Sequence, residues 1–521
     1  MSKIPNSTSR YVLLALILCA LAGVKLAYNP FPIGDYGRDG AIYYAIADQF
    51  ADGQGLTTRL SDIGQGVSAL PHASPWYPVW PFVLGTAGKL IGLQRAASLI
   101  PEFFYLVALA LLYVLMNAVV ASPLVWSRLP LDVGHLTVLT FGLNPVFFKY
   151  TSLPFTEGLA FSLMFATTLV LIRAMETERE SLFLLAGICT GMSYLARSQN
   201  ALMMGFVPLL PFTVQLARRQ YGRAFRFSAL VALPCLLMTL VWGAYLYQNF
   251  ESFHPAIMID TTAIHETPDV EQLEIVAKTD SAFGFIKDKL KGVRVAFNPE
   301  SEFSYFASFG RSVYLIPFAV LYLLSTRKVR SVEWSRYSAV IAVAIGPVIT
   351  VHMMHKAVWG EWNFQFRHGL PIIFVIGLSL ALLLSRESFV RALTLTILSL
   401  SLYSSVRHIR AEMYNEYLPP TGAKLDLVRW IDSQPTTTYV TTRAWDLSAL
   451  TNARFHAAYC GASPDQLAVY ARINVTDVIV LDGNKECRLF EKLDDYATRR
   501  IQFDTIEVWR LNGVLTSANN P

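Results

Sequence analysis

Acidic residues at the start of one short stretch have the type and spacing for proton-transfer chemistry. Asp35 and Asp39 stand at the head of residues 34–50, where apolar side chains recur at helical spacing from Ala41 onward. A carboxylate held there can take the proton of an incoming hydroxyl or amine. It can equally cap the helix, because negative charge is favourable at a helix N-terminus. We expect an amphipathic helix that lies on the bilayer, and both roles of its carboxylates stay open at this point.

Further ionisable residues stand at the ends of other apolar runs. Glu157 opens one run, Arg197 closes another, and Arg367 precedes a third, with His355 nearby. Arginine holds phosphate through parallel hydrogen bonds, so these two arginines suit a leaving phosphate group. Charged side chains at helix ends also reach the interface simply to stay hydrated. As a set, however, carboxylates and cations at one end of a helical bundle predict a polar, functional cavity.

The chain that must position these residues is strongly apolar. Of its 521 residues, 53% are hydrophobic and only 16% are charged, against about a quarter in soluble domains. Its net charge of +5 sits in short loops, where it is a topology signal and does not indicate a nucleic-acid partner. Apolar runs of membrane-spanning character occupy residues 11–28, 76–92, 98–120, 132–148, 154–172, 182–196, 199–216, 228–248, 311–325, 337–354, 368–385 and 390–406.

The loop charges predict the topology of these runs. The densest basic loops, at residues 218–226 and 326–330, should be cytoplasmic, which puts the loop at about 249–310 and everything after Arg407 outside. Four prolines lie within residues 71–81, at the start of run 76–92, and a broken helix backbone is not tolerated in contact with lipid. We therefore expect this run to be re-entrant or surface-lying, so that the first loop, about 29–97, is also external.

Both ends of the chain carry their own signals. The first run, after Lys3 and Arg10, reads as an uncleaved membrane anchor, with a signal peptide as the alternative. Residues 411–521 have the composition of a small external α/β domain, following a membrane domain at 1–410. Its expected elements are a helix at 424–431, strands at 439–442, 477–482 and 506–511, and a helix at 463–472. Cys460 and Cys487 either form a disulfide or stay free.

Taken in order, four patches of the sequence resemble the GT-C superfamily of integral-membrane glycosyltransferases. This superfamily uses polyprenyl-phosphate sugar donors and includes protein mannosyltransferases, aminoarabinose transferases and lipopolysaccharide-core transferases. Residues 39–47 followed by 52–55 are similar to its first external loop, and residues 74–78 to the proline-rich patch that follows. Residues 187–200 resemble its glycine-rich helix ending in a basic residue, and residues 367–371 resemble its late Arg-Tyr-x-x-Pro patch.

The resemblance implies roles for individual residues. Asp39 falls on the catalytic position, and because Gly40 stands where the family has a second acid, Asp35 or Glu157 would have to supply it. Arg197 and Arg367 fall at the phosphate of the donor. The residues that we expect to contact substrate are Tyr43, His72, Trp76, Tyr77 and His355. A divalent metal is possible, but no metal-binding pattern identifies its ligands, and no other cofactor is expected.

The sequence therefore predicts a multi-pass helical protein of the inner (plasma) membrane, with about 11–13 transmembrane helices and a small C-terminal α/β domain. We expect an enzyme that moves a sugar, with inversion, from a polyprenyl-phosphate donor to an external acceptor glycan, lipid or protein. A glycan polymerase or ligase with a diphosphate carrier is the alternative, and it would not require the Asp39 patch. A transporter is less favoured, because the chain shows no matching halves and its charges lie at helix ends.

Overall fold

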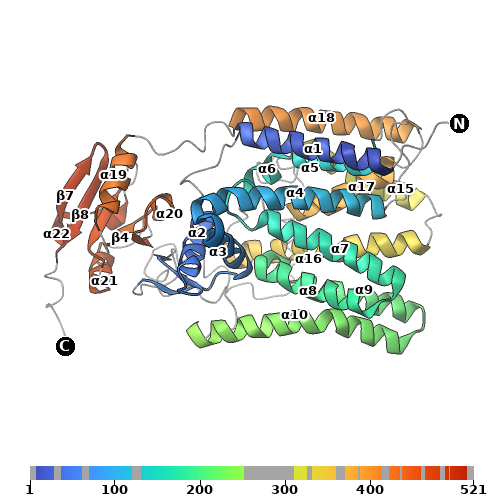
Figure 1. Cartoon of the computed structure of the whole chain (residues 1–521), viewed down its shortest axis with the longest axis horizontal. Helices are drawn as coiled ribbons and strands as arrows, with labels where there is room; N and C mark the ends of the chain where they lie inside the picture. The colour runs from blue at the N-terminus through green and yellow to red at the C-terminus, as the bar shows by residue number, and fades with distance from the viewer. Residues whose placement is uncertain are drawn as a thin grey trace.

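The fold has a bundle of long helices and a smaller α/β part at one end of it. The computed structural model describes residues 7–28, 37–61, 70–119, 131–250, 310–325, 331–359, 370–384, 388–412, 422–434, 437–458, 464–473, 475–481, 487–491 and 493–512. Helices α2 (Gly37–Ala51) and α3 (Val79–Ile91) lie between the bundle and the C-terminal strands (Figure 1). These two described helices of the first loop therefore separate the bundle from the C-terminal strands.

The bundle consists of apolar helices that follow the predicted runs. Within the described residues, 5 helical segments are long and apolar enough to cross a membrane. They belong to α1 (Ser7–Tyr28), α4 (Leu93–Val119), α7 (Glu157–Thr177), η1 (Ser198–Asn200) joined to α9 (Met203–Ala217), and α10 (Tyr221–Phe250). The remaining bundle elements are α5 (Val133–Gly142), α6 (Pro145–Tyr150), α8 (Glu180–Ala196), η3 (Gly310–Tyr314), α15 (Leu315–Ser325), α16 (Ser331–Trp359), α17 (Ile373–Leu384) and α18 (Ser388–Glu412). The predicted polytopic helical membrane fold is confirmed.

Two runs differ from simple crossings. The run at 132–148 is divided into α5 and α6 at Asn144, whose side chain accepts a hydrogen bond from the Phe147 backbone N–H and caps α6. Pro145 follows at the first helical position, where its missing N–H is harmless. Helix α3 has 13 residues, too few to span a hydrocarbon core of about 30 Å. Its length agrees with the re-entrant or surface-lying run predicted from the prolines.

Helix α8 packs closely on α10 through two glycines. Gly187 and Gly191 are one turn apart, the small-xxx-small spacing that lets helix backbones approach in membranes. A Cβ added at Gly187 would lie 2.3 Å from the Val231 backbone oxygen, and one at Gly191 would lie 2.7 Å from Met238 Sδ. The Cys235 thiol donates to the Gly187 carbonyl at 3.2 Å. This contact fixes the position of α8, which ends beside Arg197.

Helix α2 is enclosed, contrary to the expected surface-lying amphipathic helix. Every residue from Gly40 to Ala47 is buried. Ile42 and Ile46 pack against residues of the C-terminal part, whereas Tyr43 packs with aromatic residues of the bundle. The apolar face that we expected to lie on the bilayer instead belongs to one hydrophobic core with residues of α19 (Ala423–Asp432) and α20 (Trp445–Ser448), the latter seen beside α2 in Figure 1.

The C-terminal sheet takes one strand from the first loop. Its order is β2-β5-β4-β6-β8-β7, with β2, β5, β4 and β6 parallel and the β6-β8-β7 end antiparallel. Strand β2 pairs Leu60 with Phe455 and Ser61 with His456. The strands are β2 (Leu60–Ser61), β4 (Thr438–Thr441), β5 (Arg454–Ala457), β6 (Asp477–Val480), β7 (Ala497–Phe503) and β8 (Ile506–Leu511), and a separate antiparallel pair joins β1 (Thr57–Thr58) to β3 (His72–Ala73). The predicted division at residue 410 gave no sign of this shared strand.

The expected C-terminal elements are present as α19, β4, α21 (Gln466–Arg472), β6 and β8, with short η5 (Arg488–Phe490) and α22 (Leu493–Tyr496) between them. Strand β7 was not predicted. It is a sheet edge with exposed Arg499 and Arg500, so it lacks the apolar alternation of a half-buried strand. Cys487 is disulfide-bonded. Cys460 lies outside the described residues, and the free cysteines among those described are Cys19, Cys189 and Cys235.

Candidate active site

A buried ion pair joins two of the predicted site residues. Glu157 is in the first turn of α7, where the helix N-terminus favours negative charge. Arg197 follows the last residue of α8 in an extended conformation, which turns its side chain out of the helix. Arg197 Nη1 lies 2.5 Å from Glu157 Oε1, and the side chains are 11% and 1% exposed. Residues 40 positions apart thus form one charged unit at the end of the bundle.

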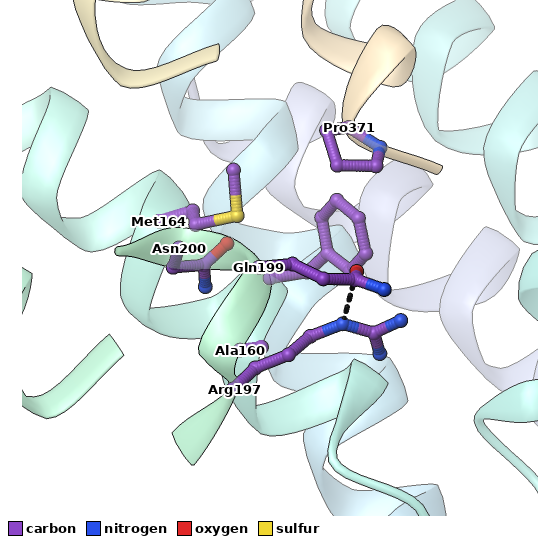
Figure 2. A pocket seen from close by; sticks show the side chains of 7 residues that line it. Ala160, Met164, Arg197, Gln199, Asn200 and Pro371 are labelled. Carbon is purple, nitrogen blue, oxygen red and sulfur yellow. Dashed lines mark hydrogen bonds between the residues drawn. The ribbon is translucent and has the colours of Figure 1, made fainter. Parts of the chain in front are cut away.

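A small pocket opens next to this pair. The Arg197 Nε–H donates to Gln199 Oε1 at 2.6 Å, and the two terminal nitrogens of the guanidinium extend beyond the Gln199 amide (Figure 2). Asn200 is held by its Nδ2–H donating to Ser193 Oγ at 2.8 Å. The pocket is lined by Ala160, Phe161, Met164, Arg197, Gln199, Asn200 and Pro371. It therefore combines an apolar wall with one cation and two amides.

An aromatic group lies beside Arg197. The rings of Tyr43 and Trp76 meet edge to face with centroids 5.3 Å apart, and those of Tyr77 and Tyr194 meet at 5.4 Å. The Tyr77 hydroxyl shares hydrogen bonds with Tyr194 and with Ser198, the residue after Arg197. The structure thus brings predicted substrate residues Tyr43, Trp76 and Tyr77 close to the Glu157–Arg197 pair.

Asp39 belongs to the same side of α2. It lies in the first turn of the helix, is half-buried, and precedes Tyr43 by four residues, so both project from one helix face. Because Tyr43 packs in the aromatic group, this face of α2 is the one turned toward the bundle. Asp35 and Arg367 lie outside the described residues, as does the side chain of His355. Pro371, four residues after Arg367, lines the pocket.

His72 is placed differently from the other predicted substrate residues. It lies on β3, its Nδ1 is 2.8 Å from the Ala73 carbonyl oxygen, and its electrostatic neighbour is His456 on β5. Burial lowers the pKa of His72, and burial together with His72 lowers the pKa of His456 to about 4. His72 therefore lies at the junction with the C-terminal sheet and does not join the aromatic group.

Two contributions to the site were not predicted from the sequence. Gln199 and Asn200 come two and three residues after Arg197, within the same motif, but only their fold into η1 shows that they line the pocket. Arg59 was not among the residues that the sequence predicted for the site. Its Nε lies 3.0 Å from Asp48 Oδ2, and its terminal nitrogens donate to the carbonyls of Thr451 and Ser448 at 2.6 and 3.2 Å.

Arg59 connects α2 to the C-terminal domain. Its side chain is 5% exposed, and Asp48 in the last turns of α2 is 22% exposed. Burial raises the pKa of Asp48, and the positive charge of Arg59 offsets only part of this rise. As for metals, the described part of the chain contains no group of three or more His, Cys, Asp or Glu side chains that could hold an ion.

Comparison with solved structures reveals proteins that share the fold of this chain. No family model and no curated protein matches the chain. The Archaeoglobus fulgidus oligosaccharyltransferase in complex with zinc and sulfate aligns with a TM-score of 0.57 and 14% identity, over 89% of this chain and 67% of that one. Another structure of that enzyme holds an inhibitory peptide and a dolichol-phosphate.

Two further solved structures align over nearly the whole of this chain. ArnT from Cupriavidus metallidurans bound to undecaprenyl phosphate gives a TM-score of 0.56 and 12% identity, over 99% of this chain and 100% of that one. The mycobacterial arabinofuranosyltransferase AftD gives 0.53 and 14%, over 96% of this chain and 41% of that one. All three proteins are GT-C glycosyltransferases. Identities this low establish the fold, and the resemblance predicted from the sequence is confirmed at that level.

Proposed function

We propose that this chain, which has the fold of the GT-C glycosyltransferases, transfers a sugar from a polyprenyl-phosphate carrier to an acceptor lipid, polysaccharide or protein. One observation carries the proposal. A largely buried arginine, Arg197, stands at a pocket with an apolar wall, beside an aromatic group and the helix that bears Asp39. A cation next to apolar surface suits a lipid phosphate, and aromatic rings beside it suit a sugar.

Arg197 is proposed to hold the phosphate of the donor and of the spent carrier. A guanidinium has five N–H donors, and the contacts with Gln199 and Glu157 leave several of them for a ligand. The undecaprenyl phosphate in ArnT and the dolichol-phosphate in the archaeal enzyme support this class of ligand. We assign Arg367 to the same phosphate, because Pro371 of its motif lines the pocket.

Asp39 is proposed as the base of a single inverting displacement. The acceptor hydroxyl or amine gives its proton to the Asp39 carboxylate while its oxygen or nitrogen forms a bond to the anomeric carbon. The bond from that carbon to the phosphate oxygen breaks, and its electron pair leaves with the phosphate. Glu157 is the weaker choice for the base because it is already paired with Arg197. Asp35 keeps its place as the alternative base.

The active site is proposed to face the outside of an inner (plasma) membrane. The basic loops predict this orientation, and the disulfide-bonded Cys487 in the C-terminal domain supports it, because disulfides persist in oxidising compartments. Zinc is present in one archaeal structure. In this chain the described residues contain no group of three ligands, so we assign no step to a metal.

A polymerase or ligase that uses a diphosphate carrier would share the Arg197 site but would not need Asp39. The test is mass spectrometry of lipids, surface glycans and glycoproteins from a deletion strain that carries the wild-type gene, Asp39→Asn or Arg197→Ala. Loss of one sugar mass, restored by wild type and by neither variant, is expected. Restoration by Asp39→Asn would favour the diphosphate alternative, and an unchanged profile after deletion would contradict the transferase function.

A further inference from the structure

The positive charge of Arg197 is already matched within the protein. Among the described residues its polar contacts are Glu157, at 2.5 Å, and Gln199, which is neutral. An arriving lipid phosphate therefore meets an ion pair of zero net charge rather than an unpaired cation. A site built only to bind phosphate tightly would not place a carboxylate against its cation.

Glu157 is held in an unusual way for a structural carboxylate. It is 1% exposed, and neither of its oxygens accepts a hydrogen bond within the described part of the chain. Buried carboxylates normally gather several donors, because losing water without replacement is unfavourable. The buried charge of Glu157 is therefore stabilised by the positive charge of Arg197, and a ligand that binds the Arg197 guanidinium weakens this stabilisation.

The chemistry of the carrier makes this competition useful. The donor is a phosphodiester with one negative charge, whereas the spent carrier is a phosphate monoester that can carry two. An arginine without a rival would hold the spent carrier more tightly than the donor. Gln199 holds the Nε side of the planar guanidinium (Figure 2), so a phosphate and the Glu157 carboxylate must share the N–H donors of its two terminal nitrogens.

We propose that Glu157 competes with the lipid phosphate for Arg197 and so promotes release of the spent carrier. The inference rests on the proposed function, since it takes Arg197 as the phosphate ligand. Glu157 then acts as a specificity residue, one that sets the balance between donor and spent carrier and transfers no proton.

The test measures binding of undecaprenyl phosphate to the purified protein in detergent. Glu157→Gln keeps the size of the side chain and removes its charge, so the Kd should fall by about tenfold or more. The matched control is Glu180→Gln. Glu180 is also in the first turn of a helix and 2.6 Å from an arginine, but it is 43% exposed, and its replacement should leave the Kd unchanged.

The outcomes separate this inference from the proposed function. Arg197→Ala should raise the Kd for undecaprenyl phosphate. The double variant Arg197→Ala, Glu157→Gln should have the same Kd as Arg197→Ala alone. If Arg197→Ala leaves the Kd unchanged, the phosphate site itself is wrong. If Arg197→Ala weakens binding but folded Glu157→Gln binds no more tightly than wild type, the competition is wrong. If Glu157→Gln fails to fold, Glu157→Asp replaces it in the test, because the shorter side chain moves the carboxylate away from Arg197. Glu157→Asp should lower the Kd several-fold, and an unchanged Kd would overturn the inference.

Discussion

Replacing Arg59 with methionine tests whether the C-terminal domain holds α2, the helix that carries Asp39. Arg59 is the charged contact between the first loop and this domain, through Asp48 on one side and the carbonyls of Ser448 and Thr451 on the other. Methionine fills a similar apolar volume but makes none of these contacts. The Asp48 carboxylate and both carbonyls then lose a donor.

The expected destabilisation follows from burial. Removing one partner of a buried ion pair typically raises the free energy of the folded state by about 3–5 kcal/mol, because the other charge stays buried and unpaired. Asp48 is 22% exposed, so water can compensate for part of this loss, and we expect about 2–4 kcal/mol. The effect should concentrate at the contact between α2 and the C-terminal domain, since the bundle helices do not depend on Arg59.

The assay is thermal unfolding of the purified protein in detergent, combined with limited proteolysis of the first loop. Arg59→Met should lower the melting temperature and expose the first loop to cleavage. Arg429→Met is the matched control, because Arg429 is 71% exposed and lies 3.6 Å from an exposed Asp426, a kind of pair worth at most about 1 kcal/mol. Equal behaviour of the two variants would refute the role given to Arg59.

Two further perturbations test the fold around the site. His456 has a pKa of about 4 in the folded protein and about 6.5 in the unfolded chain, so between these values the unfolded chain binds one more proton than the folded protein. The stability contributed by neutral His456 should therefore be complete above pH 6.5 and fall by about 3 kcal/mol as the pH is lowered to 4. His456→Gln should weaken this dependence when the melting temperature is measured across the pH range. Gly187→Ala should force α8 and α10 apart and lower the melting temperature, because the new Cβ would lie 2.3 Å from the Val231 carbonyl oxygen. The control is Gly205→Ala, which has open space around it and should leave the melting temperature unchanged or raise it. A flat pH profile in wild type, or equal effects of the two glycine substitutions, would contradict these contacts.

The helices and much of the C-terminal domain were predictable because their signals are local. Apolar runs marked the bundle, and the strands at Thr438–Thr441 and Asp477–Val480 stood out as short β-rich segments. The pairing of Leu60–Ser61 with β5 was not predictable, since a two-residue strand has no periodicity and its partner lies almost 400 positions later. Its place depends on long-range packing alone.

The same limit applies to the site. The sequence placed Glu157 and Arg197 at one end of the bundle, but it gave them separate roles, and only the structure shows that they neutralise each other. The burial of α2 was missed for a related reason. The apolar residues Ile42, Ala45 and Ile46 predicted a face that lies on the bilayer, and nothing local to this stretch shows that the C-terminal domain, much later in the chain, covers that face.

Asp39, as the proposed base of a transfer from a polyprenyl-phosphate donor, can be tested separately from donor binding. The most direct measurement compares Asp39→Asn with wild type in two readouts of the same purified sample, the rate of sugar transfer and the Kd for undecaprenyl phosphate. Asp39 is the third residue of α2, so a role confined to the helix N-terminus would lower stability by only about 0.3–1 kcal/mol when the charge is removed, and it predicts no change in either readout. If Asp39 is the base, its replacement should lower the transfer rate by about 10²–10⁴ and leave the Kd unchanged. Transfer at the wild-type rate by Asp39→Asn would contradict this role.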